Sequence, residues 1–168
     1  MAHLIRSVNY NNSKDAGILE ACLSKWFRNP KDLNLAAPKI RFPFKFTQWK
    51  SYYLEISSTK SFVLEDNGWI IGHISLRYKT ENNRAHIFHL IISPESRGSG
   101  LGKLLIDHAE SEARQMRCAE ITLYVIRTNQ AAINLYENLG YKKQKQMRGN
   151  SYRMLKSIEK ETPTPKTK

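Results

Sequence analysis

Apolar side chains recur along the chain with two different periods, and these periods predict helices and strands in a mixed order. From Ser13 to Phe27 they lie three and four residues apart, which predicts a helix with Ser13 as its N-cap. A second helical pattern begins at Thr47 and continues to Ile56. Between them, residues 32–43 contain two prolines and are expected to form an irregular connection.

The middle and the end of the chain have the features of strands. Asp66-Asn67-Gly68 separates two apolar stretches and indicates a hairpin, because Asn and Gly tolerate positive φ. Two amphipathic helices are expected at 101–116 and 129–139, the second ending at Gly140. The strands are expected at 61–65, 69–78, 84–93, 121–125, 141–147 and 151–155.

This order of elements predicts a single domain of the α/β (α+β) class. A run of adjacent strands passes into a strand–helix–strand unit, so we expect a mixed, mostly antiparallel sheet of about six to seven strands with helices on both faces. The domain is expected to span residues 1–156. Residues 157–168 contain one apolar residue, Ile158, and are expected to be disordered because they bury too little surface to offset chain entropy.

The sequence has no features typical of secreted, membrane-spanning, disulfide-rich or zinc-binding proteins. Arg6 and Asn9 interrupt the first ten residues, so no signal peptide is evident, and no apolar run reaches the roughly 18 residues that a membrane helix needs. Cys22 and Cys118 are far apart and match neither a disulfide framework nor a zinc motif. We therefore expect a soluble, cytoplasmic protein with no membrane partner.

The chain is strongly basic, with 27 Lys and Arg against 15 Asp and Glu, a net charge of +12. Residues 38–50 and 141–156 contain several basic residues and no acidic one. Such an excess favours polyanionic partners, namely nucleic acid, an acidic protein surface or a phosphorylated cofactor. Neither stretch contains a nucleic-acid recognition motif, so a nucleic-acid-binding module is the alternative hypothesis and not the first.

The segment Arg97-Gly98-Ser99-Gly100-Leu101-Gly102 carries the clearest chemical signal. It follows a predicted strand and opens a predicted helix, where glycines leave backbone N–H groups uncovered. These donors and the positive end of the helix dipole form a site for phosphate, and Arg97 and Lys103 add positive charge beside it. The segment is neither a P-loop nor a Rossmann fingerprint. It predicts a pyrophosphate site of another kind.

Residues 84–141 resemble the acetyl-CoA-binding core of the GNAT superfamily of N-acetyltransferases. Residues 97–102 match the superfamily's R/Q-x-x-G-x-G/A motif, and residues 90–94 (LIISP) are similar to its L-x-V-x-P strand exit. Downstream, Asn129, Ala132, Leu135, Tyr136 and Gly140 match N-x-x-A-x-x-L-Y-x-x-x-G. The matches cover roughly a third of the chain, in the right order and at the right spacing.

The resemblance implies a GNAT fold and an acyltransferase that uses acetyl-CoA as co-substrate. The acetyl group would pass to a primary amine, of a small molecule or of a peptide or protein, by direct attack in a ternary complex. Leu90, Ile91 and Ile92 would contact the pantetheine arm, and Asn129 would contact the cofactor or orient the site. The pyrophosphate would be held by Arg97, Gly98, Ser99, Gly100, Leu101, Gly102 and Lys103.

The resemblance also implies that Tyr136 contacts the cofactor and acts as the general acid, donating a proton to the departing thiolate. The base is less defined, because some members carry a glutamate where His86 stands and others carry one where Tyr124 stands. His86 is the first candidate for the base, followed by His89, while Glu65, Tyr124 and a water chain stay open.

Four further expectations belong to this hypothesis. No metal is predicted, because His86 and His89 are three residues apart on a strand and should face opposite sides. Members of the superfamily often form homodimers, although no segment here identifies an interface. A GNAT-like protein that senses CoA without turnover is a further alternative. Some aromatic residues of the first third are expected to line the acceptor pocket, from the set Trp26, Phe27, Phe42, Phe44, Phe46, Trp49, Tyr52 and Tyr53.

Overall fold

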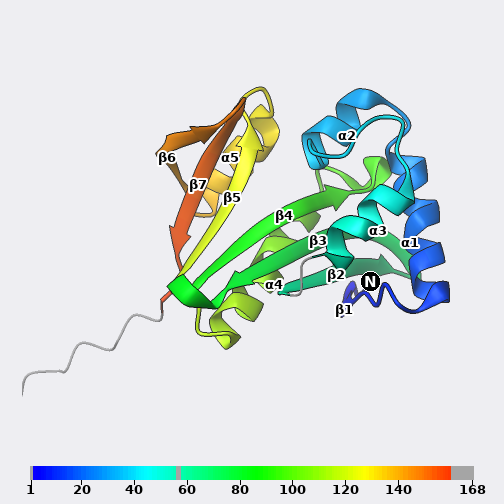
Figure 1. Cartoon of the computed structure of the whole chain (residues 1–168), viewed down its shortest axis with the longest axis horizontal. Coiled ribbons are helices and arrows are strands. Elements are labelled where there is room, and N and C mark those ends of the chain that lie inside the picture. Colours follow the sequence, from blue (N-terminus) through cyan, green and yellow to red (C-terminus); the bar gives the residue numbers. More distant parts are fainter. Residues whose placement is uncertain (1, 56–57, 160–168) are drawn as a thin grey trace, which may run out of the picture.

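The computed structural model describes residues 2–55 and 58–159, which form a seven-stranded sheet with helices on both faces (Figure 1). The strand order is β1-β2-β3-β4-β5-β7-β6, and every neighbouring pair is antiparallel except β4 and β5. The strands are β1 (Leu4–Ser7), β2 (Thr59–Asp66), β3 (Trp69–Lys79), β4 (Arg84–Ile92), β5 (Glu120–Ile126), β6 (Lys142–Arg148) and β7 (Ser151–Ser157). The predicted mixed, mostly antiparallel sheet is confirmed.

Five α-helices accompany the sheet in the described part of the chain. They are α1 (Ser13–Trp26), α2 (Pro30–Ala36), α3 (Phe46–Leu54), α4 (Leu101–Gln115) and α5 (Gln130–Asn138), with short 3₁₀ helices at Thr80–Asn82 and Pro94–Ser96. None of the helices in these described residues has both the length and the apolar character that crossing a bilayer requires.

Two hydrophobic cores lie on opposite faces of the sheet. Successive residues of β2 show this, because Phe62 and Leu64 pack in one core and Val63, between them, packs in the other. Helices α4 and α5 cover the first core, whereas α1, α2 and α3 cover the second. The sheet is therefore covered on both sides, as the sequence pattern predicts.

The irregular connection expected at 32–43 is wrong in its first part, where α2 forms. Asn29 is the N-cap of this helix, since its side-chain oxygen accepts a hydrogen bond of 2.9 Å from the Asp32 N–H. Pro30 occupies the first helical position, where a missing N–H costs nothing. The Asn-Pro pair that ends α1 therefore also starts the next helix.

Smaller differences concern the ends of the first helices. Asn12, and not Ser13, caps α1, accepting a hydrogen bond of 3.0 Å from the Asp15 N–H. The short edge strand β1 is not apparent from the sequence, because four residues are too few to show an alternation. The second predicted helix is α3 and ends at Leu54; residue 56 lies outside the described residues.

The folded part continues past residue 156, the boundary expected from the sequence. Strand β7 ends at Ser157, and Ile158 is only 2% exposed in the core that α4 and α5 cover. The Ile158 N–H also donates a hydrogen bond of 2.9 Å to the Ala119 carbonyl. The expected disorder is therefore wrong for Ser157 and Ile158, while residues 160–168 lie outside the described residues.

We expect Ile158→Ala to lower the free energy of unfolding by about 2–4 kcal/mol, because it removes a buried side chain and leaves a cavity. Ile18→Ala is the matched control, since Ile18 is 41% exposed on α1 and should change stability by less than about 0.5 kcal/mol. Denaturant unfolding of both variants measures the difference. Equal midpoints for the two would show that residue 158 is not part of the core.

Candidate active site

The parallel strands β4 and β5 pair over a short distance and then separate. Their pairing is limited to Arg84–His86 against Glu120–Thr122, although both strands continue for several residues. Figure 1 shows the two arms of the sheet meeting at this junction and diverging beyond it. Backbone groups of β4 that face the gap thus have no β5 partner, and the sheet opens at the carboxyl ends of these two strands.

A cavity of about 520 Å³ lies where the strands separate. Its lining includes all the residues expected to bind cofactor except Ser99 and Tyr136, namely Leu90, Ile91, Ile92, Arg97, Gly98, Gly100, Leu101, Gly102, Lys103 and Asn129. Helix α2 supplies another wall through Asp32, Leu35 and Ala36. The structure thus gathers the residues of three sequence motifs around one space.

The glycine-rich segment has the backbone that a phosphate site requires. Gly98 (φ 78°) and Gly100 (φ 80°) adopt the left-handed conformation, and Gly100 is the N-cap of α4 without a side-chain cap. The first N–H groups of α4 therefore have no acceptor within the helix and point out of its start, where the glycine-rich segment lines the cavity. Gly102 has a different role: a Cβ there would lie 3.2 Å from Leu135 Cδ2, so glycine allows α4 to pack closely on α5.

Two cations flank this segment, and neighbouring groups hold both in place. The Arg97 guanidinium lies 3.7 Å from the Asp32 carboxylate and donates through Nε to the Ile92 carbonyl at 3.2 Å. Lys103 Nζ lies 2.6 Å from Asp107, one turn further along α4. The Asp32 contact connects α2 to the segment, so the helix that was not predicted forms part of the site.

Ser99 and Asn129 shape the backbone around the cavity. The Ser99 hydroxyl donates to the Ser96 carbonyl at 2.6 Å, which fixes the turn before α4. Asn129 is the N-cap of α5, accepting a hydrogen bond of 3.3 Å from the Ala132 N–H, and it also lines the cavity. The N-x-x-A motif thus has a local structural reason, because an N-cap residue bonds the N–H of the residue three positions later, here Ala132.

Tyr136 lies in the core under α5, next to the cavity-lining Leu135 but outside the lining itself. Its side chain is 7% exposed, and its ring packs edge-on against Tyr141 with centroids 5.8 Å apart. Burial raises the pKa of Tyr136 above that of a free phenol. The hydroxyl is therefore fully protonated at neutral pH, as a proton donor must be.

A second, smaller cavity of about 120 Å³ adjoins the first and shares Leu35 and Ala36 with it. His86 lines it, and its Nδ1 lies 2.9 Å from the Thr122 hydroxyl on β5. Burial, followed by the charges of Arg77 and other cations, lowers the pKa of His86 to about 3. The imidazole is thus neutral at physiological pH and free to accept a proton, although it is a weak base.

His89 lines the same small cavity as His86, so the expectation that they face opposite sides is wrong. The reason is a bulge in the β3–β4 pairing, where His89 has φ 51° and the alternation of side chains shifts by one residue. His89 Nδ1 lies 2.7 Å from the Tyr53 hydroxyl, and its ring stacks on Trp49 with centroids 4.3 Å apart. Burial lowers the pKa of His89 well below its usual value.

Some of the aromatic residues named from the sequence line the cavities and others lie in the core, whereas Phe42 is exposed. Phe27 lines the large cavity and Tyr52 the small one, whereas Trp49 and Tyr53 are buried around His89. Glu65 lines neither cavity, and its carboxylate pairs with Arg6 at 2.7 Å. Across the described ranges, no cluster of three His, Cys, Asp or Glu side chains is arranged to hold a metal ion.

Sequence reasoning did not single out Arg77 and Arg148, which line the small cavity from β3 and from the end of β6. The acid-free stretch 141–156 was a signal for the second of them. Nothing local marks Arg77, because its place depends on the pairing of β3 with β4.

Comparison with known proteins places these features in a family. The model described as the acetyltransferase (GNAT) family matches residues 24–141. NAA10, the catalytic subunit of the N-terminal acetyltransferase A complex of Arabidopsis thaliana, is 38% identical over 102 residues, 56% of this chain and 53% of the relative. Streptothricin acetyltransferase of Streptomyces lavendulae is 30% identical over 88 residues, 52% of this chain and 47% of the relative. The chain spans about half the length of these curated relatives.

Solved structures share the fold at low sequence identity. The PaiA N-acetyltransferase of Thermoplasma acidophilum, in complex with coenzyme A, has a TM-score of 0.72 and 20% identity, covering 94% of this chain and 99% of its own. The ribosomal-protein-S18-alanine N-acetyltransferase of Escherichia coli has a TM-score of 0.71 and 20% identity, covering 96% and 97%. At this identity the likeness concerns the fold.

Proposed function

Because the chain belongs to the GNAT acetyltransferase family, we propose that it transfers an acetyl group from acetyl-CoA to a primary amine. The observation that carries the proposal is the cavity of about 520 Å³, which joins the open edge of β4 to the uncapped start of α4. One end offers N–H donors and cations for a pyrophosphate, and the other offers the free edge of a strand for an amide-containing arm.

Different residues around this cavity bind different parts of acetyl-CoA. The backbone of residues 98–103 binds the pyrophosphate, with Arg97 and Lys103 adding charge-assisted contacts. Leu90, Ile91 and Ile92 pair with the pantetheine arm in place of the missing β5 neighbour. Asn129 holds the start of α5 against the same space. This arrangement would leave the thioester near the point where β4 and β5 meet.

In the reaction, the amine lone pair attacks the thioester carbon, the C–N bond forms and the C–S bond breaks. Backbone N–H groups of β4 stabilise the oxyanion of the tetrahedral intermediate. The departing thiolate takes a proton from Tyr136, whose phenol is kept protonated by burial, and the resulting phenolate regains a proton from solvent before the next turnover. The attacking nitrogen loses a proton, so an amide and free CoA are the products.

We propose that His86 accepts the proton of the amine and passes it to solvent. Because its pKa is lowered to about 3, it is neutral above about pH 4 and does not titrate between pH 5 and 8. A base this weak contributes little, so His86→Gln should lower kcat by only about tenfold. The fall of kcat/KM toward low pH then reflects protonation of the amine and should be the same in both enzymes.

Initial rates from pH 5 to 9 measure this. An inflection near the pKa of a free imidazole, present in the wild type and absent from His86→Gln, would contradict the lowered pKa of His86 and show a stronger base than proposed. A kcat of His86→Gln equal to that of the wild type would exclude His86 as the proton acceptor.

The direct test of the proposed function is to incubate the protein with acetyl-CoA and a set of primary amines. Release of free thiol that depends on the amine, with the N-acetylated product identified by mass spectrometry, is the expected result. CoA binding without thiol release for any amine would instead indicate a protein that senses CoA.

We also infer a cytoplasmic location, supported by the two unpaired cysteines, Cys22 and Cys118. A homodimer stays a prediction from the family resemblance, which sedimentation measurements would test.

A further inference from the structure

The small cavity at His86 continues into a third space of about 310 Å³, and both are lined by cations. Arg77, His86, Tyr124 and Arg148 line both spaces. Lys39 adds a charge to the small cavity, and the third space is also lined by Lys79, Arg84 and Arg153. Neither lining contains a carboxylate among the described residues. The side of the site away from the glycine-rich segment therefore has a strongly positive surface.

Most of these cations lack an acidic partner within the described ranges. Arg84 pairs with Glu120, but no ion pair of Arg77, Arg148 or Arg153 occurs there. A surface of paired charges would have little net potential, whereas the unpaired cations here leave a positive potential that attracts an anionic ligand.

Arg77 is the most constrained of the group. Its guanidinium lies 5.1 Å from the centre of the Phe88 ring and 5.6 Å from that of Tyr52, and it donates to the Tyr52 hydroxyl at 3.1 Å. Its Nε is buried without a hydrogen-bond partner. Arg148 lies over the Tyr124 ring at 5.6 Å. Aromatic rings thus orient both guanidinium groups beside His86 without neutralising them.

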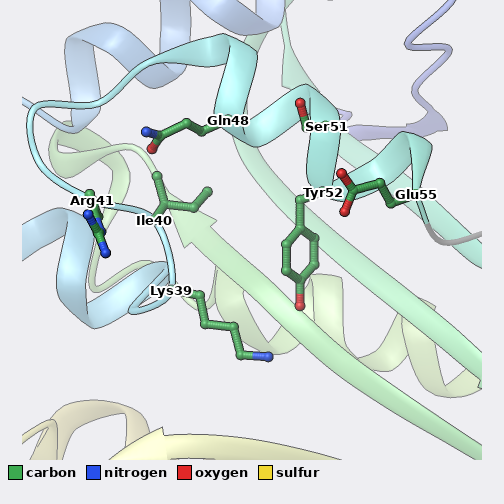
Figure 2. A pocket seen from close by; sticks show the side chains of 7 residues that line it. All are labelled: Lys39, Ile40, Arg41, Gln48, Ser51, Tyr52 and Glu55. Carbon is green, nitrogen blue, oxygen red and sulfur yellow. The ribbon is translucent and has the colours of Figure 1, made fainter.

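Figure 2 shows a neighbouring pocket between the α2–α3 connection and α3, in which Lys39 and Tyr52 extend toward the same side. Glu55 is the one carboxylate that lines this pocket in the described part of the chain, and it belongs to neither cavity at His86. A positively charged acceptor would therefore meet no carboxylate in the lining of either cavity at His86.

We propose that the acceptor is an amine that carries a carboxylate or phosphate group on the same molecule, and that Arg77 and Arg148 bind this anionic group. The inference rests on the proposed acetyl transfer and narrows its substrate. Arginine forks match carboxylate and phosphate oxygens in geometry as well as charge. Nearby cations also disfavour an ammonium ion, so they increase the fraction of amine that is neutral and able to attack. A polyamine would meet repulsion on both counts.

The test compares kcat/KM for pairs of acceptors that differ in one anionic group. Suitable pairs are ethanolamine phosphate with ethanolamine, and glycylglycine with glycylglycinamide; spermidine serves as a polycation. We expect each acidic member to be preferred by about a hundredfold or more, because two arginines contact the anion, and spermidine to be the poorest acceptor. A preference confined to one pair identifies phosphate or carboxylate as the anion.

Arg148→Gln should reduce this preference by about tenfold, because Arg148 is exposed and its loss removes one charged contact. Arg28→Gln is the matched control: it removes the same charge at an exposed position that lines none of the four spaces described above, and the preference should stay. Arg77→Gln should have the larger effect, with its melting temperature measured to confirm folding.

The outcomes are separable. If no amine of any charge is acetylated, the proposed function fails. If neutral members are acetylated as well as the acidic ones, acetyl transfer stands and the inference is overturned. A preference that persists in both arginine variants would place the anion elsewhere and would also overturn the inference. Salt-sensitive binding of duplex DNA that is lost in Arg148→Gln, together with no preference among amines, would overturn it as well.

Discussion

Tyr136→Phe is expected to lower kcat by about a hundredfold or more, with the KM for acetyl-CoA changed by less than about threefold. The substitution removes a hydroxyl and keeps the ring, so the core around Tyr141 stays packed. Without the phenol, the thiolate must leave unprotonated or take its proton from water. Steady-state kinetics with saturating amine measure the effect, and thermal unfolding confirms that the variant is folded.

Tyr152→Phe is the matched control. Tyr152 is half-buried on β7 and lines none of the cavities around the site, yet the same hydroxyl is lost. Its kcat should equal that of the wild type within about twofold. A Tyr136→Phe enzyme with nearly full kcat would exclude this phenol as the proton donor, and the thiolate would then need no protein acid.

Gly100→Ala should weaken CoA binding by about tenfold or more. Gly100 has φ 80°, where a side chain costs about 1–2 kcal/mol, and relief of this strain turns the first N–H groups of α4 away from the pyrophosphate. Nothing lies within 4 Å of the added Cβ, so the effect comes from the backbone and not from a clash. Calorimetric titration with CoA measures the dissociation constant.

Gly68→Ala imposes the same strain elsewhere. Gly68 has φ 82° in the β2–β3 hairpin, and its Cβ would also meet open space. Both variants should lose similar stability, but only Gly100→Ala should lose affinity for CoA. Equal affinities in the two variants would mean that the segment before α4 does not hold the pyrophosphate.

The sequence predicted most of the fold because its longer elements carry clear periods. Helix α4 and the strands around it follow from alternation and from caps close in sequence, and the glycine-rich segment is recognisable from six consecutive residues. Helix α2 also had a local signal, the Asn29-Pro30 pair, but the two later prolines suggested an irregular segment.

Other parts of the site depend on contacts between distant segments. The bulge at His89 arises from the pairing of β3 with β4, and the residue types in β4 do not predict it. Likewise, Arg77 and Arg148 become neighbours of His86 through the order of the sheet. The chemistry of the glycine-rich segment is local and was visible, whereas the charge around the acceptor is a property of the assembled sheet.

Helix α2 lies between the two cavities of the site. Leu35 and Ala36 border both the cavity proposed for acetyl-CoA and the smaller one at His86, which opens toward Arg77 and Arg148. With acetyl-CoA in the larger cavity and the amine in the smaller one, as proposed, the acetylated product could leave while CoA stays bound. Neither Cys22 nor Cys118 lines either cavity, which agrees with the proposed direct attack of the amine on the thioester.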